Sequence, residues 1–459
     1  MTRWKGWILN LPGKNSTSKQ GAARRRRVHG PASKPVGGGA ENDKGLRGSE
    51  CWRRHLHPSD FHGLSALAAT AVAEGLELAE DLHGAVAGVF LRIRPLGAVT
   101  AFLYRKAKGS TRVLYRCLTT LLPPHATPSP ARQSTPEREA VIAALNGLVG
   151  DHLAESDNPM QISMQMRMAG KPLPAGRQAL AAAVQPASGK LLVLVHGLCR
   201  SDLQWRRKNH DHGAALARDL GYTPVYLFYN SGLHISTNGK ALAAQLEALF
   251  RAWPVAVEEI TIIGHSMGGL LARSAFHYAR LAGKEWPDHL QNMVFLGTPH
   301  HGAPLERGGS WLTAVLGRNR YTAPFARLGR IRSAGITDLR YGNLVDEDWV
   351  GTDRFEHGGD RRQPLPLPRG VRCYTIAGSV GKRYGDLRER FLGDGIIPLD
   401  TALGKHVHGR RSLSFPRSRQ WIAYGVHHLD LLGSLAVYER IRSWLAPAGM
   451  RSSRSARRP

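Results

Sequence analysis

The chain has 459 residues, of which 63 are Lys or Arg and 35 are Asp or Glu, so its formal net charge is +28. Hydrophobic residues make up 42% of it and include ten Trp, which is enough for a real core and excludes global disorder. The four Cys form no C-x-x-C pair, which argues against a disulfide scaffold and a structural zinc site. We therefore expect a folded protein of two to three domain-sized units without a metal or cofactor.

The positive charge is concentrated at the two ends of the chain. Residues 1–55 carry 13 Lys or Arg and three acids, and residues 451–459 carry four Arg and no acid. These two segments hold half of the excess charge, and their composition predicts basic, disordered tails at 1–55 and 448–459. For residues 1–55, a nucleic-acid arm and an over-extended start of translation are the alternative interpretations.

An amphipathic helical hairpin is predicted over residues 56–125. Apolar residues recur at three- and four-residue spacing from Leu64 to Ile93, Pro95 ends this helix, and a second helix over about 96–122 carries five Lys or Arg. Such a hairpin can lie on an anionic membrane surface, and packing against the rest of the protein is the alternative. With no signal peptide and no apolar run of 18 residues, we expect a cytoplasmic protein that can associate with a membrane.

Residues 126–185 are predicted to be a Pro-rich linker with one helix. Ser134 is followed three residues later by Glu137, with Pro136 between them, which is a capping-box pattern. It predicts a helix that ends near His152. The residues from 156 to 189 are rich in Met, Gly and Pro and are expected to be a connecting segment.

From 186 to 447, short apolar runs alternate with helical patterns. The expected strands are 191–195, 222–229, 260–263, 293–296, 371–376 and 421–426, and the expected helices are 212–220, 240–252, 268–281 and 429–444. This alternation predicts an α/β fold with a doubly wound, mostly parallel sheet and helices on both faces. Residues 300–370 would be a long insertion, which we interpret as a lid or cap; a helical insertion that only packs is the alternative.

A nucleophile motif follows the expected strand 260–263. The pentapeptide Gly-His-Ser-Met-Gly fits G-x-S-x-G, in which the serine stands at a sharp strand-to-helix turn and the glycines permit close backbone approach. The motif alone is weak, but a strand before it and a helix after it make Ser266 the candidate nucleophile. The residues expected to support the turn are Gly264, His265 and Gly268.

A serine hydroxyl needs a base to take its proton and an acid to orient that base. In this fold the chain order is serine, acid, histidine. Asp394, in a tight turn between two glycines, is the preferred acid, and Asp400 and Asp386 are its rivals. For the base we favour His428, directly before the apolar start of the final helix, over His427, because adjacent side chains point in different directions.

Two backbone N–H groups must face the negative charge that develops on the substrate carbonyl oxygen. One is expected from Met267, the residue after the nucleophile, and the other from Leu198, in the loop after the first core strand. His196 and Gly197 precede Leu198 and are expected to support this oxyanion loop. Cys199 beside it is interpreted as a small packing residue rather than a second nucleophile.

With these motifs in place, the sequence resembles an α/β-hydrolase of the lipase and esterase type. It is similar in particular to the bacterial branch related to GPI inositol-deacylase-like and triacylglycerol-lipase-like hydrolases. The resemblance covers about residues 186–447 and includes the Gly-Thr-Pro-His-His-Gly stretch at 297–302. It implies Ser266 as nucleophile, Asp394 as orienting acid and His428 as base. The stretch 229–239 also resembles this branch, but no role is assigned to it.

The leading hypothesis is therefore a serine hydrolase that cleaves small-molecule or lipid carboxylic esters through an acyl-enzyme. The same triad can cleave amides or thioesters or transfer the acyl group, and the motifs do not separate these reactions. A basic membrane-surface binding protein with an incidental hydrolase core is the alternative from another class. Nucleic acid is not the expected partner, because no Walker A loop or zinc-finger spacing accompanies the charge. Acyl-chain length and oligomeric state are left open.

Overall fold

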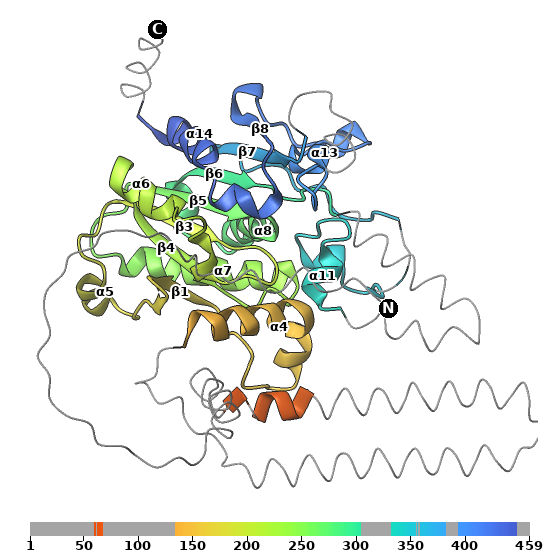
Figure 1. The fold of residues 1–459 in the computed structure, drawn as a ribbon, viewed down its shortest axis with the longest axis horizontal. Helices are drawn as coiled ribbons and strands as arrows, with labels where there is room; N and C mark the ends of the chain where they lie inside the picture. The colour runs from red at the N-terminus through yellow and green to blue at the C-terminus, as the bar shows by residue number, and fades with distance from the viewer. Residues whose placement is uncertain are drawn as a thin grey trace, which may run out of the picture. The chain divides into compact units, whose positions relative to one another are not determined.

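The computed structural model describes residues 59–60, 62–67, 134–303, 332–354, 356, 359–381 and 393–447. Its centre is an eight-stranded sheet in the order β2-β1-β4-β3-β5-β6-β7-β8 (Figure 1). The six strands from β3 to β8 are parallel to one another. β1 is antiparallel to both of its neighbours, β4 and β2. Their bounds are β1 Gln165–Met168, β2 Lys171–Pro172, β3 Lys190–Val195, β4 Thr223–Phe228, β5 Glu259–His265, β6 Leu290–Leu296, β7 Arg372–Ser379 and β8 Gln420–Tyr424. The mostly parallel sheet predicted from the sequence is confirmed.

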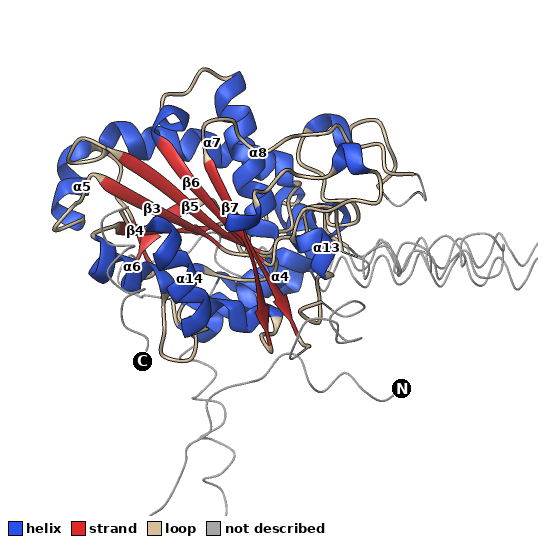
Figure 2. Cartoon of the chain, turned by 90° about the horizontal axis from the view of Figure 1, so that it is seen from above, coloured by secondary structure: helices blue, strands red, loops and turns tan. Residues whose placement is uncertain are grey.

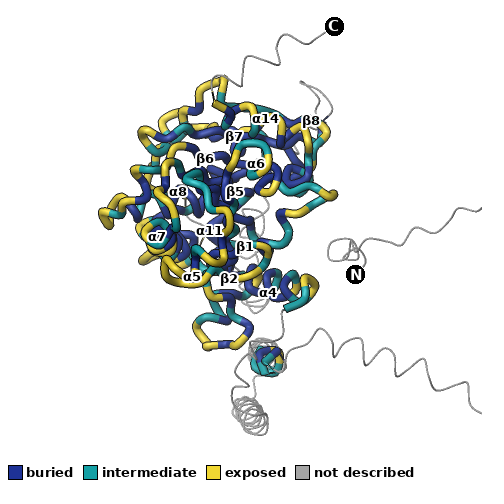
Figure 3. Tube along the Cα trace, turned by 90° about the vertical axis from the view of Figure 1, so that its left-hand side faces the viewer, coloured by how far each residue is buried: buried dark blue, intermediate teal, exposed yellow. Residues whose placement is uncertain are grey.

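Helices cover both faces of this sheet, as Figure 2 shows. Their bounds are α4 Pro136–Glu155, α5 Arg177–Ala183, α6 His212–Leu220, α7 Ile235–Ala252, α8 Met267–Leu281, α11 Ala334–Asp338, α13 Leu399–Ala402 and α14 Leu435–Leu445. Alternate residues of a strand point to opposite faces, so Val193 packs with α5, α7 and α8 while Leu194 packs with α6 and α14. Almost every residue of the central strands is buried (Figure 3), which explains why these strands are apolar at almost every position.

The start of α4 differs from the capping box predicted at Ser134. Thr135 is the N-cap residue, and its side chain accepts the backbone N–H of Arg138 at 3.3 Å. Pro136 is the first helical residue, a position that proline favours, and this places Thr135 rather than Ser134 at the cap. The hydroxyl of Ser134 instead accepts a hydrogen bond from Arg138 Nη1.

Two further expectations differ from the structure. The segment 156–189 contains β1, β2 and α5, so the sheet begins before residue 186. β1 is only four residues long and rich in Met and polar residues, which hid it from the pattern of apolar strands. The single helix expected over 429–444 is a 3₁₀ helix, His428–Leu432, followed by α14. The break falls at Gly433 and at Ser434, whose side chain caps α14.

The tails at 1–55 and 448–459 lie outside the described residues, as does the hairpin 56–125 except for 59–60 and 62–67. In the parts of the chain that the structure covers, no helix combines the length and apolar character needed to cross a membrane.

Candidate active site

A sharp turn joins the central strand β5 to α8. β5 ends at His265 and α8 begins at Met267, so Ser266 alone makes the turn. Its φ of 54° and ψ of −125° are a conformation that residues with a Cβ rarely adopt. The backbone N–H of Ser266 donates to the carbonyl of Leu296 at 2.8 Å, which ties the turn to the end of β6. Ser266 is partly exposed while both neighbours are buried, so the turn brings it to the carboxyl edge of the sheet.

Two glycines permit the close packing around this turn. A Cβ on Gly268 would lie 2.3 Å from the carbonyl oxygen of Val195, at the end of β3. A Cβ on Gly264 would lie 2.6 Å from the backbone of Gly269. Any larger residue would push α8 away from the sheet, so these positions require glycine for the reason the motif predicts.

A buried histidine–carboxylate pair follows the next strands. Asp394 lies in the turn after β7, and His428 directly follows the loop after β8. His428 Nδ1 is 2.6 Å from Asp394 Oδ2, and the two side chains are 6% and 0% exposed. The other carboxylate oxygen accepts the backbone N–H groups of Ile396 and Ile397 at 3.1 and 2.8 Å. A carboxylate accepts hydrogen bonds, so His428 Nδ1 is the donor to Asp394.

Backbone contacts place this pair at the same edge of the sheet as Ser266. His265 Nε2 is 3.1 Å from the carbonyl oxygen of His428, and the two imidazole centroids are 4.7 Å apart. Gly297, at the end of β6, has a φ of +56°, and a Cβ there would lie 3.0 Å from His428 Nδ1 and 3.1 Å from Asp394 Oδ2. The structure therefore places Ser266, Asp394 and His428 after β5, β7 and β8, at the same carboxyl edge of the sheet.

The described alternatives to Asp394 and His428 are exposed rather than buried. The side chain of Asp400 is 77% exposed and faces Lys405 at 3.7 Å. His427 is exposed, whereas His428 is buried. Asp386 lies outside the described residues. Among the described candidates, only Asp394 and His428 form a buried pair.

The oxyanion loop after β3 passes beside Ser266. A Cβ on Gly197 would lie 2.9 Å from the Cβ of Ser266. Leu198 follows it and packs against the cluster that contains Met267. The N–H of Met267 is among the first of α8, where backbone N–H groups have no partner within the helix and the helix dipole is positive. This arrangement suits an anion near Ser266.

The stretch 229–239, to which we assigned no role, contacts the oxyanion loop at two points. Tyr229 donates its hydroxyl hydrogen to the carbonyl of His196 at 2.9 Å, and the two rings stack 4.4 Å apart. Ser231 Oγ accepts the backbone N–H of Cys199 at 3.0 Å, and Cys199 has a positive φ of 59°. Ser231 and Tyr229 thus hold the loop on either side of Leu198. The sequence signal was the position of this stretch, directly after the strand that pairs with β3.

We expect Ser231→Ala to lower kcat for ester hydrolysis by roughly tenfold with little change in KM, because the Leu198 N–H would lose its fixed position. This is less than the 10²-fold or greater loss typical when an oxyanion donor itself is removed. Ser236→Ala is the matched control, since Ser236 is equally buried but bonds to Trp349. Steady-state kinetics should show unchanged kcat in the control. An equal loss in both variants would contradict a role specific to Ser231.

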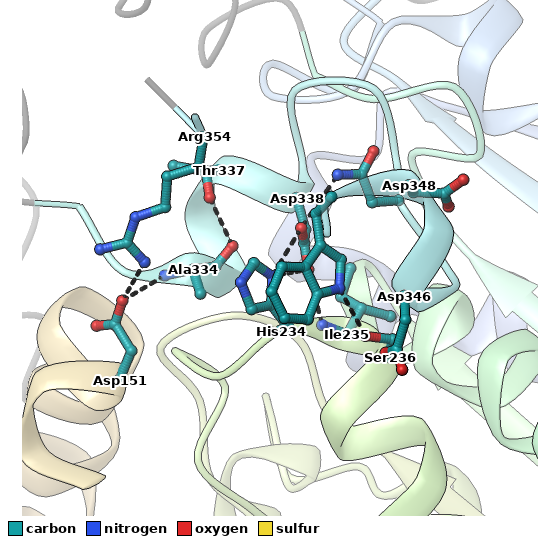
Figure 4. A network of polar contacts seen from close by, with 12 residues as sticks. Asp151, His234, Ile235, Ser236, Ala334, Thr337, Asp338, Asp346, Asp348 and Arg354 are labelled. Carbon is teal, nitrogen blue, oxygen red and sulfur yellow. Dashed lines mark hydrogen bonds and ion pairs between the residues drawn. The ribbon is translucent and has the colours of Figure 1, made fainter. Parts of the chain in front are cut away.

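Part of the expected insertion 300–370 is held by a network of polar contacts with α4 and the start of α7 (Figure 4). His234, just before α7, lies 3.1 Å from both carboxylate oxygens of Asp338 and stacks on Trp349 at 3.7 Å. Asp338 also accepts the backbone N–H of Ile235 at 2.8 Å. These contacts join α11 and the residues after it to the start of α7.

A second anchor ties the same segment to α4. Asp151 accepts the N–H of Ala334 at 2.9 Å and pairs with Arg354 at 2.5 Å. Between the anchors, Leu339 and Leu344 pack in the cluster with Met267. A lid function for 300–370 stays a prediction, because residues 304–331 of this range lie outside the described part.

Three buried histidines are held neutral by burial. Two of them, His196 and His265, lie near Ser266, and the third, His212, lies in α6. Burial lowers the pKa of His196 to about 4, and it also lowers the pKa of His265 well below the usual value. Burial similarly lowers the pKa of His212, in α6, to about 4. Each must gain a proton when the chain unfolds below pH 6.5.

We therefore expect the free energy of unfolding to be constant above about pH 6.5 and to fall between pH 6.5 and 4, since the unfolded chain binds more protons there. Each histidine should contribute on the order of 2 kcal/mol to the loss at pH 5. Urea unfolding at pH 7.5 and 5 measures it. His212→Gln should reduce the difference, while the same change at the exposed His408 should not. Equal pH dependence in both variants would contradict this assignment.

Residues 186–358 match the model of the family described as the PGAP1-like alpha/beta domain. This part of the chain is similar to a PGAP1-like α/β domain. The matched segment includes β3 to β6 and Ser266. β7, β8, Asp394 and His428 lie after the matched residues, and β7 and β8 continue the same sheet. No curated protein matches this sequence at a significant level.

Solved structures resemble this chain with low identity. A lipase-esterase related protein from Clostridium acetobutylicum is 12% identical over 56% of this chain and 95% of its own, with a TM-score of 0.32. A metagenomic carboxyl esterase is 17% identical over 66% and 86%, also with a TM-score of 0.32. A phospholipase from Legionella pneumophila is 15% identical over 47% and 46%, with a TM-score of 0.29. Likeness at this level carries no argument about the substrate.

The site is built from side chains and backbone N–H groups. Within the described ranges, no group of three or more His, Cys, Asp or Glu is placed to hold a metal ion.

Proposed function

We propose that the chain is a serine hydrolase that cleaves carboxylic esters through an acyl-enzyme. The observation that carries the proposal is the buried 2.6 Å contact between His428 and Asp394 at the sheet edge where the strained Ser266 lies. A strained serine, an oriented imidazole and helix-start N–H groups are the parts that acyl transfer requires. The PGAP1-like α/β domain supports the same reaction class.

In the proposed reaction, Ser266 Oγ attacks the acyl carbon while His428 Nε2 takes the hydroxyl proton. Asp394 stabilises the imidazolium that forms, and the N–H groups of Leu198 and Met267 bind the oxyanion. The ester C–O bond then breaks, and His428 gives its proton to the leaving alcohol. Water attacks the acyl-enzyme with the same histidine as base, which releases the acid and restores Ser266.

The reaction class is tested by comparing hydrolysis of p-nitrophenyl esters of short and long acids with matched amides and thioesters. We expect the highest kcat/KM for one of the esters. An amide or thioester cleaved faster than every ester would replace the proposed substrate class while keeping the triad. Product analysis with an added alcohol distinguishes hydrolysis from acyl transfer.

The physical form of the substrate is a separate question, raised by the net charge of +28. If the ester is presented by an anionic membrane, activity on esters in anionic vesicles should exceed that in neutral vesicles and fall as salt rises. Equal rates in both vesicle types would show that the charge does not direct the enzyme to lipid.

A further inference from the structure

A small cavity lies beside α8 and contains none of the proposed triad residues. It measures about 30 Å³, and its walls come from α8, the loop after β6 and the segments 342–348, 362–365 and 411–413. Arg273 from α8 and His300 from the loop after β6 both line it. Arg273 is only 4% exposed and His300 only 1%.

These two side chains hold hydrogen-bond donors that have no acceptor. Arg273 Nη1 is 3.4 Å from His300 Nδ1, and Nη2 donates to the carbonyl of Leu365. A guanidinium can only donate, so His300 Nδ1 accepts and the ring hydrogen is on Nε2. Within the described structure, neither Arg273 Nε nor His300 Nε2 has a partner. Buried donors without acceptors are rare and costly, so both point to something that accepts.

The charge of Arg273 also has no carboxylate partner among the residues that the structure describes. Burial lowers its pKa to about 10, with the Arg362 charge acting in the same direction, so the guanidinium keeps its proton at neutral pH. His300 is neutral, because burial and then the Arg273 charge lower its pKa well below the usual value. A buried cation without a counter-ion is strongly unfavourable.

Two described acids in this region, Asp348 and Asp360, already have hydrogen-bonding partners. Asp360 pairs with Arg362 at 2.8 Å and with Arg411 at 2.5 Å. Asp348 accepts the backbone N–H groups of Leu344, Val345 and Gln363. Among the described residues, the three arginines that line this cavity thus have two carboxylates, Asp348 in its wall and Asp360 bonded to two of them, which leaves one positive charge unbalanced.

We propose that this cavity is a binding site for one small monovalent anion of about the size of chloride. The volume admits one or two water-sized groups, which suits a halide better than phosphate. The anion supplies the missing charge and the missing acceptor for Arg273 and His300. Because α8 begins directly after Ser266, the bound anion fastens the nucleophile's helix to the loop after β6 and to Leu365. This inference does not depend on the reaction that the triad performs.

The test uses the full chain in gluconate, chloride, bromide and phosphate at equal ionic strength, with thermal unfolding as the readout. Chloride and bromide should raise Tm saturably relative to gluconate, by about 5 °C or more at 100 times the dissociation constant. Phosphate should act no differently from gluconate. Arg273→Met should abolish the anion dependence, and Arg280→Met, an exposed arginine of the same helix, should retain it.

The wild-type comparison decides the proposal even if Arg273→Met does not fold, and His300→Phe provides a second variant with at least tenfold weaker chloride dependence. Equal Tm values in chloride and gluconate would overturn the proposal and assign water to the cavity. A chloride effect that persists unchanged in both cavity variants would overturn it as well.

Discussion

Replacing Ser266 with Ala is expected to lower kcat for ester hydrolysis by about 10⁴- to 10⁶-fold, because no acyl-enzyme can form without the hydroxyl. The variant should also fail to react with a fluorophosphonate probe that labels the wild type. The fold should be retained, since Ser266 is held by its backbone N–H bond to Leu296 and not by the side chain. Initial rates, probe labelling and circular dichroism check these three statements.

Ser443→Ala is the control, because Ser443 is exposed on α14 and far from the turn in sequence. This control should react with the fluorophosphonate probe and hydrolyse the ester at the same rate as the wild type. If Ser266→Ala labels as strongly as this control, the nucleophile lies elsewhere and the proposed function fails.

The second large effect on kcat is expected from replacing one of the two adjacent histidines, His427 and His428. His428→Gln should lower kcat by about 10⁴- to 10⁶-fold, because it removes the base that takes the Ser266 proton and leaves Asp394 without its partner. His427→Gln should change kcat by less than about threefold, because His427 is exposed and outside the buried pair.

The pair of variants is well matched, since the same substitution is made one residue apart. Steady-state kinetics with one p-nitrophenyl ester measure both. A large loss in His427→Gln with activity retained in His428→Gln would reverse the assignment. Double replacement of His428 and Ser266 should cost little more than either alone, because the two residues act as one unit.

The sheet and the sharp turn at Ser266 were predictable from the sequence because each depends on a local pattern. Strands buried on both faces are apolar throughout, and the serine turn needs glycines at fixed offsets. The order serine, acid, histidine then reduced the candidates to a few residues. Flanking residues in the sequence favour Asp394 as the acid and His428 as the base. Their contact, however, depends on β7 and β8 lying side by side.

Other features depend on contacts between distant segments and left no such pattern. Ser231 bonds to Cys199 only because β4 lies beside β3. The Arg273 cavity combines residues from five separate segments, and in the sequence Arg273 is simply a charged residue of an amphipathic helix. The helix break before α14 was also not predictable. Ser434 caps α14, but a serine within a helical pattern predicts a cap only when the preceding turn is known.

The position of β8 has a consequence for how activity is lost. β8 is one of the two edge strands of the described sheet and has only five residues, yet the proposed base follows it. Edge elements open more readily than central ones, so β8 and α14 can detach as a sub-global unit while β5 and the serine turn stay folded. Heating or denaturant should then inactivate the enzyme before the bulk of the sheet unfolds, and amide hydrogen exchange should be faster in 420–445 than in β3 and β5.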